Sequence, residues 1–170
     1  MSARLPPMLA IAAYSGTGKT TLLKQVIPAL RQRQIRVGLI KHTHHDMDVD
    51  TPGKDSYELR KAGADQTLVA SDRRWALMTE TPEQQPLDLA FLASRFDTAN
   101  VDIILVEGFK HERISKIILY RASVGRPLGE MLDEHVIAVA SDRSVDYPGQ
   151  QLDINDPQAV ANFIADWLEK

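Results

Sequence analysis

The sequence predicts an α/β fold in which a mainly parallel, twisted sheet carries helices on both faces. Two observations lead to this prediction. Short, unbroken apolar runs are typical of strands that are buried on both faces, and helical patterns alternate with these runs along the chain. The runs occupy residues 8–13, 37–40, 67–70, 75–78, 101–106, 117–120 and 136–140.

The helices are predicted from apolar side chains that recur at spacings of three and four. Residues 18–33 show this pattern through Leu22, Val26 and Leu30, and shorter helices are expected at 56–62 and 86–95. The clearest helix follows Asp156, a good N-cap, and begins at Pro157, a residue suited to the first helical position.

Composition narrows the class of protein. The length of 170 residues is ordinary for one domain, which we expect to span 1–170. The absence of cysteine excludes disulfides, thiolate zinc sites and cysteine nucleophiles. A net charge of −3 argues against nucleic-acid or membrane binding, and no apolar run approaches the ~18 residues of a membrane span. We therefore expect a cytoplasmic protein.

A phosphate-binding loop is the first functional motif. Residues 13–20 read Ala-Tyr-Ser-Gly-Thr-Gly-Lys-Thr, which fits the P-loop pattern Gly-x-x-x-x-Gly-Lys-[Ser/Thr] except that Ala13 replaces the first glycine. Alanine suffices there if its φ angle is negative. The apolar run 8–13 precedes the motif and a predicted helix follows it, so the context predicts a P-loop NTPase fold.

The residue types of this loop suit a nucleoside triphosphate. Glycines let the backbone approach phosphate oxygens, and the amides at the start of the helix favour an anion. Lys19 can reach the β- and γ-phosphates and is predicted as a catalytic residue. The hydroxyl of Thr20 can bind Mg²⁺, and Thr21 can donate to the α-phosphate. The predicted nucleotide-binding residues of the loop are Ser15, Gly16, Thr17, Gly18, Lys19, Thr20 and Thr21.

An acidic residue ends a second buried strand. Residues 101–108 read Val-Asp-Ile-Ile-Leu-Val-Glu-Gly, which places Glu107 at the carboxyl end of the apolar run. Such an acid beside a P-loop binds the Mg²⁺ shell or orients water, so Glu107 is predicted as a metal and catalytic residue. Asp102 lies at the opposite end and is expected to be a strand-start residue.

The polar segment 41–50 follows another strand and admits three interpretations. Asp46 or Asp48 could bind Mg²⁺ through its outer sphere on a loop that responds to the γ-phosphate. Alternatively, His42, His44 and His45 could form a transition-metal site. The third interpretation is a hydrated loop without a ligand.

Basic residues after this segment suggest a rim that accepts an anionic partner molecule. Lys54, Arg60 and Lys61 follow the polar segment, and Lys110 follows Glu107.

The last candidate residue concerns the nucleobase. The run 136–140 leads to Asp142, and GTP-binding proteins commonly place an aspartate there to accept hydrogen bonds from guanine. The Asn-Lys pair that usually precedes such an aspartate is absent, and Val139 and Ala140 stand in its place. Asp142 is therefore either a guanine-binding residue or an ordinary loop acid.

Three segments together resemble the MobB family, the molybdopterin-guanine dinucleotide biosynthesis accessory proteins. They are Ser-Gly-Thr-Gly-Lys-Thr-Thr at 15–21, Lys-His-Thr-His-His-Asp at 41–46 and Leu-Val-Glu-Gly-Phe-Lys at 105–110. The resemblance implies a homodimeric GTP-binding protein with weak GTPase activity, with Lys19 and Thr20 on phosphate and Mg²⁺ and Glu107 near the hydrolytic water. It implies action beside the guanylyltransferase that attaches GMP to molybdopterin, as an adapter or by delivering GTP or molybdopterin.

Two alternatives to this function stay open at the level of sequence. One is a small-molecule kinase or ATP-dependent ligase on the same fold. The other is a nucleotide-gated metallochaperone that uses the loop from His42 to His45. Slow hydrolysis would agree with the lack of an arginine within the motifs, and Arg113 and Arg121 are among the arginines that the sequence does not place.

Overall fold

The computed structural model describes residues 4–45, 47–83, 85–109 and 111–170. The chain forms two compact units. The main unit consists of the chain up to His42 and from Leu89 onward, and the inserted unit consists of Thr43–Asp88.

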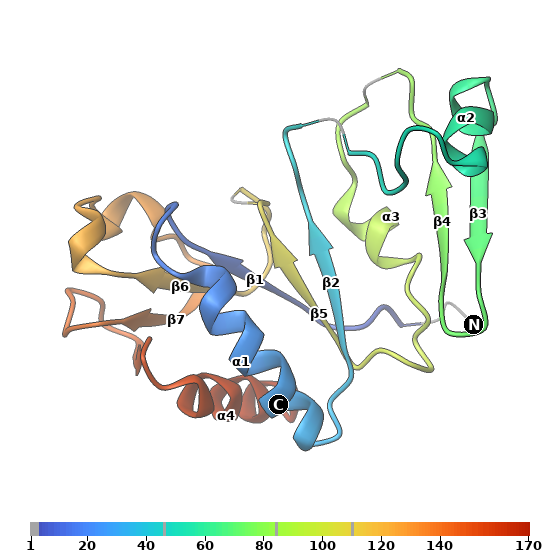
Figure 1. Ribbon diagram of the computed structural model, residues 1–170. Helices are drawn as coiled ribbons and strands as arrows, with labels where there is room; N and C mark the ends of the chain where they lie inside the picture. Colours follow the sequence, from blue (N-terminus) through green and yellow to red (C-terminus); the bar gives the residue numbers. More distant parts are fainter. Residues whose placement is uncertain (1–3, 46, 84, 110) are drawn as a thin grey trace. The chain divides into compact units, whose positions relative to one another are not determined.

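The main unit is built on a six-stranded sheet with the order β2-β5-β1-β6-β7-β8. Every neighbouring pair in this sheet is parallel. The strands are β1 (Met8–Ala12), β2 (Val37–Lys41), β5 (Ile103–Glu107), β6 (Lys116–Tyr120), β7 (Val136–Ser141) and β8 (Gln150–Asp153). The strand β1, which leads into the predicted P-loop, thus lies in the interior of the sheet (Figure 1).

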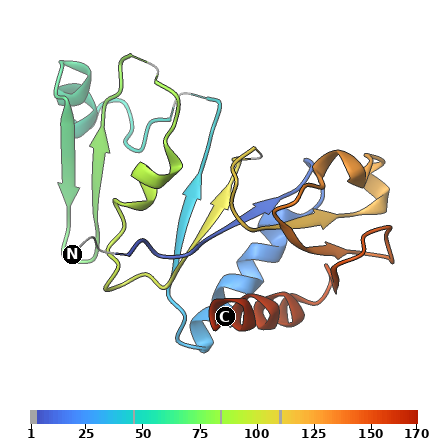
Figure 2. The ribbon, with the colours of Figure 1, turned by 180° about the vertical axis from the view of Figure 1, so that it is seen from behind.

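Helices cover both faces of this sheet. Helices α1 (Lys19–Gln32) and α4 (Pro157–Leu168) lie side by side across one face (Figures 1 and 2), where they pack on alternate strand residues such as Leu9 and Leu105. The short helix α3 (Leu89–Ala93) packs on the other face against Ala10 and Ile104. The central strands are buried on both sides, as continuous apolar runs require. The predicted α/β class is confirmed.

The ends of the helices follow from local chemistry. The side chain of Asp156 accepts a hydrogen bond from the amide of Ala159 at 3.0 Å, as the sequence predicts for the N-cap of α4. After β6, the chain forms two short 3₁₀ helices, η1 (Ala122–Val124) and η2 (Leu128–Met131). In the described ranges, no helix combines the length and apolar character needed to cross a membrane.

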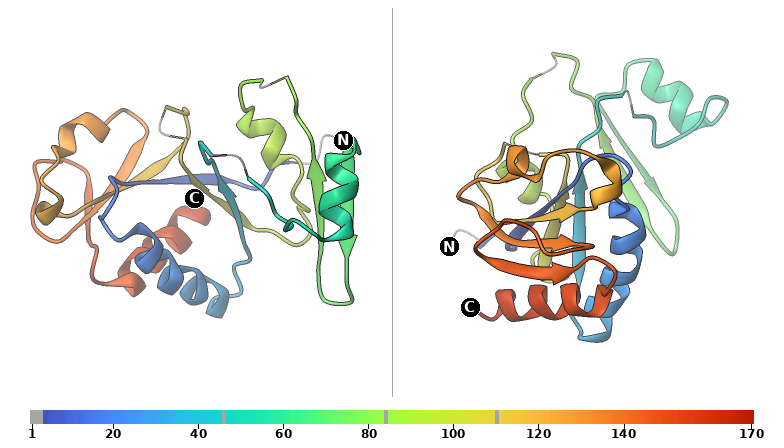
Figure 3. Two further views of the ribbon diagram at one scale, coloured as in Figure 1. Left: turned by 45° about the horizontal axis from the view of Figure 1, so that its top comes forward. Right: turned by 90° about the vertical axis from the view of Figure 1, so that its left-hand side faces the viewer.

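The inserted unit contains helix α2 (Asp55–Lys61) and two antiparallel strands, β3 (Gln66–Ala70) and β4 (Trp75–Thr79). Figure 3 shows α2 beside this hairpin. The prediction that these two apolar runs are strands covered on both faces was wrong: they form a separate sheet, and most of their residues are exposed. A hairpin with a helix on one face leaves the other face uncovered.

Several elements differ from the sequence prediction. Strand β8 was not predicted, because Gln150–Asp153 is mainly polar and lies at the edge of the sheet. Strand β5 begins at Ile103 and not at residue 101. Helix α3 covers Leu89–Ala93, and residues 86–88 precede it without helical structure.

Candidate functional site

The carboxyl ends of the parallel strands gather the polar residues of the main unit at one edge of the sheet. Strand β1 leads into the loop 13–18, and β5 ends at Glu107. Arg121, Asp142 and Asn155 follow the ends of β6, β7 and β8. Ligands of open α/β sheets bind at this edge, so it is the candidate site.

The loop before α1 has the backbone that an anion site needs. Gly16 and Gly18 have φ angles of 85° and 94°, a left-handed conformation that disfavours other residues. Gly18 occupies the N-cap of α1 without a side-chain cap, and the first turn of α1 has no acidic residue. The first amides of α1 are therefore left without side-chain acceptors, as in phosphate-binding helices. Ala13 does not have a positive φ, so alanine is compatible with its position.

A cavity of about 490 Å³, lined by residues 13–21, lies inside this loop and is called the phosphate hollow below. Lys19 lines it, and its Nζ lies 3.6 Å from Oε1 of Glu107. Glu107 is only 8% exposed, and a carboxylate at such a position needs a cationic partner. The structure thus brings together the two residues that the sequence predicts as catalytic.

His42 lies beside this ion pair. Its amide donates to the carbonyl of Glu107 at 3.0 Å, and its ring lies 5.3 Å from the ring of Phe109. A Cβ atom on Gly108 would come within 3.0 Å of His42, so only glycine allows this close approach. The end of β2 is therefore held against the end of β5 next to Glu107.

Tyr14 makes contacts that sequence reasoning missed. Its hydroxyl donates to Glu130 at 2.9 Å, and the guanidinium of Arg126 lies 4.5 Å from the centre of its ring. Burial, and next the Glu130 carboxylate, raise the pKa of Tyr14. These contacts hold the segment after β6 against the loop 13–18.

Two further hollows continue from the phosphate hollow. The middle hollow shares Gly16, Gly18 and Thr21 with it and is also lined by Arg121 and Asn155. The outer hollow follows at Asn155 and is lined by residues 141–144 and 151–153. Together they form a path along the ends of β1, β6, β7 and β8.

Asp142 lines the outer hollow, where the sequence interpretation placed a guanine. Its Oδ1 accepts a hydrogen bond from the amide of Ala122 at 3.1 Å, and Nε of Arg143 lies 4.0 Å away. One carboxylate oxygen of Asp142 is thus used to hold the end of β6, and its role toward a base stays a prediction.

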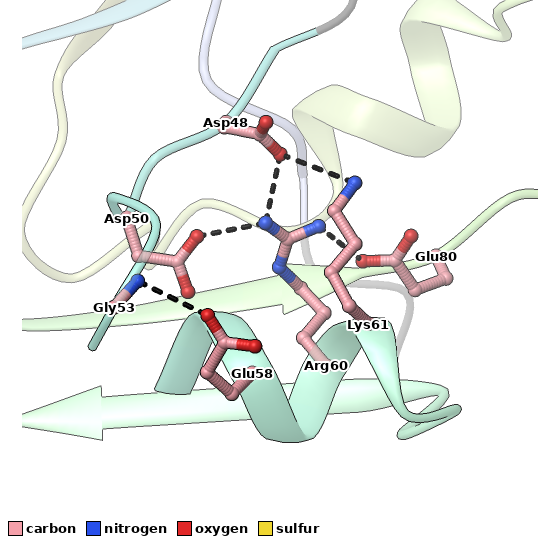
Figure 4. A network of polar contacts seen from close by, with 7 residues as sticks. All are labelled: Asp48, Asp50, Gly53, Glu58, Arg60, Lys61 and Glu80. Carbon is pink, nitrogen blue, oxygen red and sulfur yellow. Dashed lines mark hydrogen bonds and ion pairs between the residues drawn. The ribbon is translucent and has the colours of Figure 1, made fainter. Parts of the chain in front are cut away.

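Asp48, in the inserted unit, is held in an ion-pair network (Figure 4). Its Oδ1 lies 2.7 Å from Nη2 of Arg60 and 3.9 Å from Nζ of Lys61. Arg60 also contacts Asp50 at 2.8 Å and Glu80 at 3.3 Å. The prediction that Arg60 lines a rim for an anionic partner was wrong, because its side chain is 7% exposed and already faces three carboxylates.

The remaining metal predictions concern the segment after β2. Asp46, and Lys110 of the predicted rim, lie outside the described residues. In the described part of the chain, no three histidine or acidic side chains form a group that could hold a metal ion. To bind Mg²⁺, Asp48 would have to give up its contacts with Arg60 and Lys61. Its role as a metal ligand stays a prediction.

The parallel sheet, the left-handed glycines of the loop and the Lys19–Glu107 pair define a protein of the P-loop α/β class. Residues 8–142 match the model of the family described as "MobB: Molybdopterin guanine dinucleotide synthesis protein B". The chain belongs to this family.

Relatives agree with this assignment. A protein of Escherichia coli named "Molybdopterin-guanine dinucleotide biosynthesis adapter protein" is 66% identical over 96% of this chain and 94% of its own length. A protein of Haemophilus influenzae with the same name is 50% identical over 95% of this chain and 89% of its own. A solved structure titled as molybdopterin-guanine biosynthesis protein B covers 94% of this chain and 99% of its own, with a TM-score of 0.76 and 24% identity. That structure supports the fold.

Proposed function

We propose that this protein binds GTP and Mg²⁺, hydrolyses GTP slowly, and serves as an adapter in the attachment of GMP to molybdopterin. The observation that carries the proposal is the phosphate hollow with Lys19 and Glu107 beside it. The names of its relatives support the pathway, since they are called adapter proteins of molybdopterin-guanine dinucleotide biosynthesis.

The proposed Mg²⁺ ion fits the oxygen donors of the site. Thr20 offers a hydroxyl in the phosphate hollow, and Glu107 offers a carboxylate at its border. Mg²⁺ in such sites is held by one or two protein oxygens together with phosphates and water, so a cage of protein ligands is not needed. The ion would neutralise charge on the phosphates, while Lys19 binds their oxygens.

The proposed hydrolysis would use Glu107. Its carboxylate faces Lys19 at 3.6 Å, so it can orient a water molecule near the end of the phosphates. Slow hydrolysis would agree with the lack of an arginine within the sequence motifs. The proposed partner is the guanylyltransferase, which the adapter would assist by presenting GTP or molybdopterin, and the pathway named for the relatives supports it.

The proposed homodimer is supported by the exposed face of the β3–β4 hairpin. Leu68 lies opposite Leu77, and Ala70 lies opposite Trp75, so these four residues share one face. Leu68, Leu77 and Trp75 are 58%, 50% and 69% exposed. Contiguous exposed apolar side chains of this kind mark contact surfaces, and we propose that a second copy of the chain covers this face.

The experiment that tests nucleotide binding is calorimetric titration of the protein with GTP and with ATP in the presence of Mg²⁺. We expect a preference for GTP, and we expect Lys19→Ala to abolish triphosphate binding. Lys24→Ala is the matched control, because Lys24 is exposed on the same helix and does not line the phosphate hollow. Unchanged affinity of the Lys19→Ala variant would refute the assignment of the loop, and a preference for ATP would favour a kinase or ligase.

A further inference from the structure

Arg121, directly after β6, connects two parts of the candidate site. Its Nε donates to the carbonyl of Thr17 at 3.1 Å. Its Nη1 and Nη2 donate to Oδ1 of Asn155 at 3.3 and 3.4 Å. Thr17 belongs to the phosphate-binding loop, and Asn155 lies between β8 and α4. One side chain therefore joins the phosphate hollow to the hollows that follow it.

The positive charge of Arg121 lies near the N-terminus of helix α1. A Cβ atom on Gly18 would lie 3.9 Å from its Nη2, so the guanidinium lies close to the start of α1. The positive end of a helix dipole disfavours a cation, and the first turn of α1 holds no acid. Within the described ranges, Arg121 makes no ion pair with a carboxylate. The guanidinium is instead held by two uncharged oxygens, the carbonyl of Thr17 and Oδ1 of Asn155.

The next residue extends the connection toward the outer hollow. The amide of Ala122 donates to Asp142, so the end of β6 holds Thr17, Asn155 and Asp142 at the same time. The sequence lacks the Asn-Lys pair that usually precedes the guanine-binding aspartate. Arg121, directly after β6, links this end of the sheet to the loop before α1.

We propose that Arg121 is a positioning residue that fixes the distance between the phosphate subsite and the subsite for the nucleoside. The inference rests on the proposed binding of GTP. It explains how the site would bind GTP more tightly than the triphosphate group alone. The guanidinium has five N–H donors, of which three are used by Thr17 and Asn155, and it lines the middle hollow between the two subsites.

The test compares GTP with inorganic tripolyphosphate, which carries the phosphates without a nucleoside. For Arg121→Ala we expect the affinity for GTP to fall about 100-fold, the range expected when charge-assisted hydrogen bonds are lost. The affinity for tripolyphosphate should fall only about 3-fold, because the phosphate-binding loop keeps its own amides and Lys19. Arg121→Lys should lie between the wild type and Arg121→Ala, since lysine cannot hold both partners.

Two further variants sharpen the test. Asn155→Ala should lower the affinity for GTP alone, and the double variant with Arg121→Ala should lose little more, because both changes break one connection. Arg31→Ala is the control, since Arg31 is an exposed arginine in the last turn of α1 and lines none of the three hollows. It should leave the ratio of the two affinities close to that of the wild type. Thermal unfolding without ligand shows that each variant is folded.

The outcomes separate the two proposals. Equal loss of affinity for GTP and tripolyphosphate, or no loss, would overturn the role of Arg121 while the binding of GTP stands. A folded wild-type protein that binds tripolyphosphate but does not prefer GTP would overturn the proposed function, and the role of Arg121 with it.

Discussion

At the scale of single residues, the close approach of Gly108 to His42 shows how backbone geometry builds the site. Gly108 has a φ angle of 86°, and a Cβ atom there would meet both the side chain and the carbonyl of His42 at 3.0 Å. The neighbouring Glu107 is held by Lys19 and by the amide of His42. Any residue larger than glycine must move one of these groups.

We predict that Gly108→Ala lowers the free energy of unfolding by about 2 kcal/mol or more, since a left-handed backbone alone costs ~1–2 kcal/mol. The added contact with His42 supplies the rest and should weaken GTP binding. Gly125→Ala is the control, because Gly125 has a φ of 72° with no atom within 4 Å of the new Cβ. Urea unfolding of both variants measures the difference. Equal losses in the two variants would contradict the contact with His42.

A second residue-scale prediction concerns acid stability. Hydrogen bonds from Arg36 hold the pKa of Asp102 at about 2, below its ordinary value of 3.8. Because the folded state lowers this pKa, its contribution to stability is present above about pH 4 and is lost as the pH falls toward about 2. The pair is more than a third exposed, so we expect a contribution of at most about 1 kcal/mol.

The variant Asp102→Asn tests this prediction. The difference in the free energy of unfolding between wild type and variant should be present at about pH 6 and vanish near pH 2. Denaturant titrations across this range measure it. A difference that does not change with pH would show that the carboxylate charge has no part in it.

Sequence reasoning predicted some of the site residues and missed others for a physical reason. Lys19 and Glu107 belong to local patterns, a loop motif and a strand end, and the structure places them 3.6 Å apart. Tyr14 and Arg121 act through partners that lie more than 100 positions away in the chain. No local pattern contains such a contact, because the sheet creates it.

At the scale of elements, the network around Arg60 holds the inserted unit together. The guanidinium from α2 contacts Asp48 and Asp50 in the segment before the helix and Glu80 directly after β4. Arg60 lowers the pKa of Asp50, and these carboxylates raise the pKa of Arg60. Three parts of the inserted unit are thus connected through one buried cation.

We predict that Arg60→Ala lowers the stability of the inserted unit by about 2 kcal/mol. Removal of one partner of a buried ion pair costs ~3–5 kcal/mol, and the partial exposure of Asp48 and Glu80 reduces this loss. Hydrogen exchange should accelerate at the amides of residues 43–88. Lys61→Ala, the control, removes a cation that is 54% exposed and should change exchange little. Faster exchange confined to the main unit would contradict the prediction.

The strands of the main unit and helix α4 were predicted better than the hairpin and β8, for a physical reason. The buried strands of the main unit are apolar throughout, and the periodic face and N-cap of α4 mark that helix in the sequence. The hairpin strands 66–70 and 75–79 have similar runs of apolar residues, yet they are exposed. A run of apolar residues does not by itself distinguish a strand buried within the chain from one that is exposed. Strand β8 has a polar composition and pairs only along one edge.

At the scale of the whole molecule, the open face of the hairpin leads to a prediction about assembly. Leu77→Glu should convert a dimer of about 38 kDa, twice the 19.0 kDa of the chain, into monomers, since it places a charge in the apolar contact. Sedimentation at several concentrations measures this. Leu87→Glu is matched in exposure, 48% against 50%, and lies outside the hairpin, so it should leave the dimer intact. Equal effects of both variants, or a monomeric wild type, would contradict the proposed contact.

The order of the strands also has a consequence for how the chain folds. Strand β1 leaves the ribosome early, but Met8 pairs with Ile104 and Ala10 pairs with Lys116. The loop 13–18 therefore has no sheet to support it until about two thirds of the chain has been synthesised. Such distant pairing makes folding slow, because the entropy of closing a long loop is lost before the contacts form. The proposed nucleotide would therefore bind only after the central sheet has closed, so it would stabilise the finished fold and would not nucleate it.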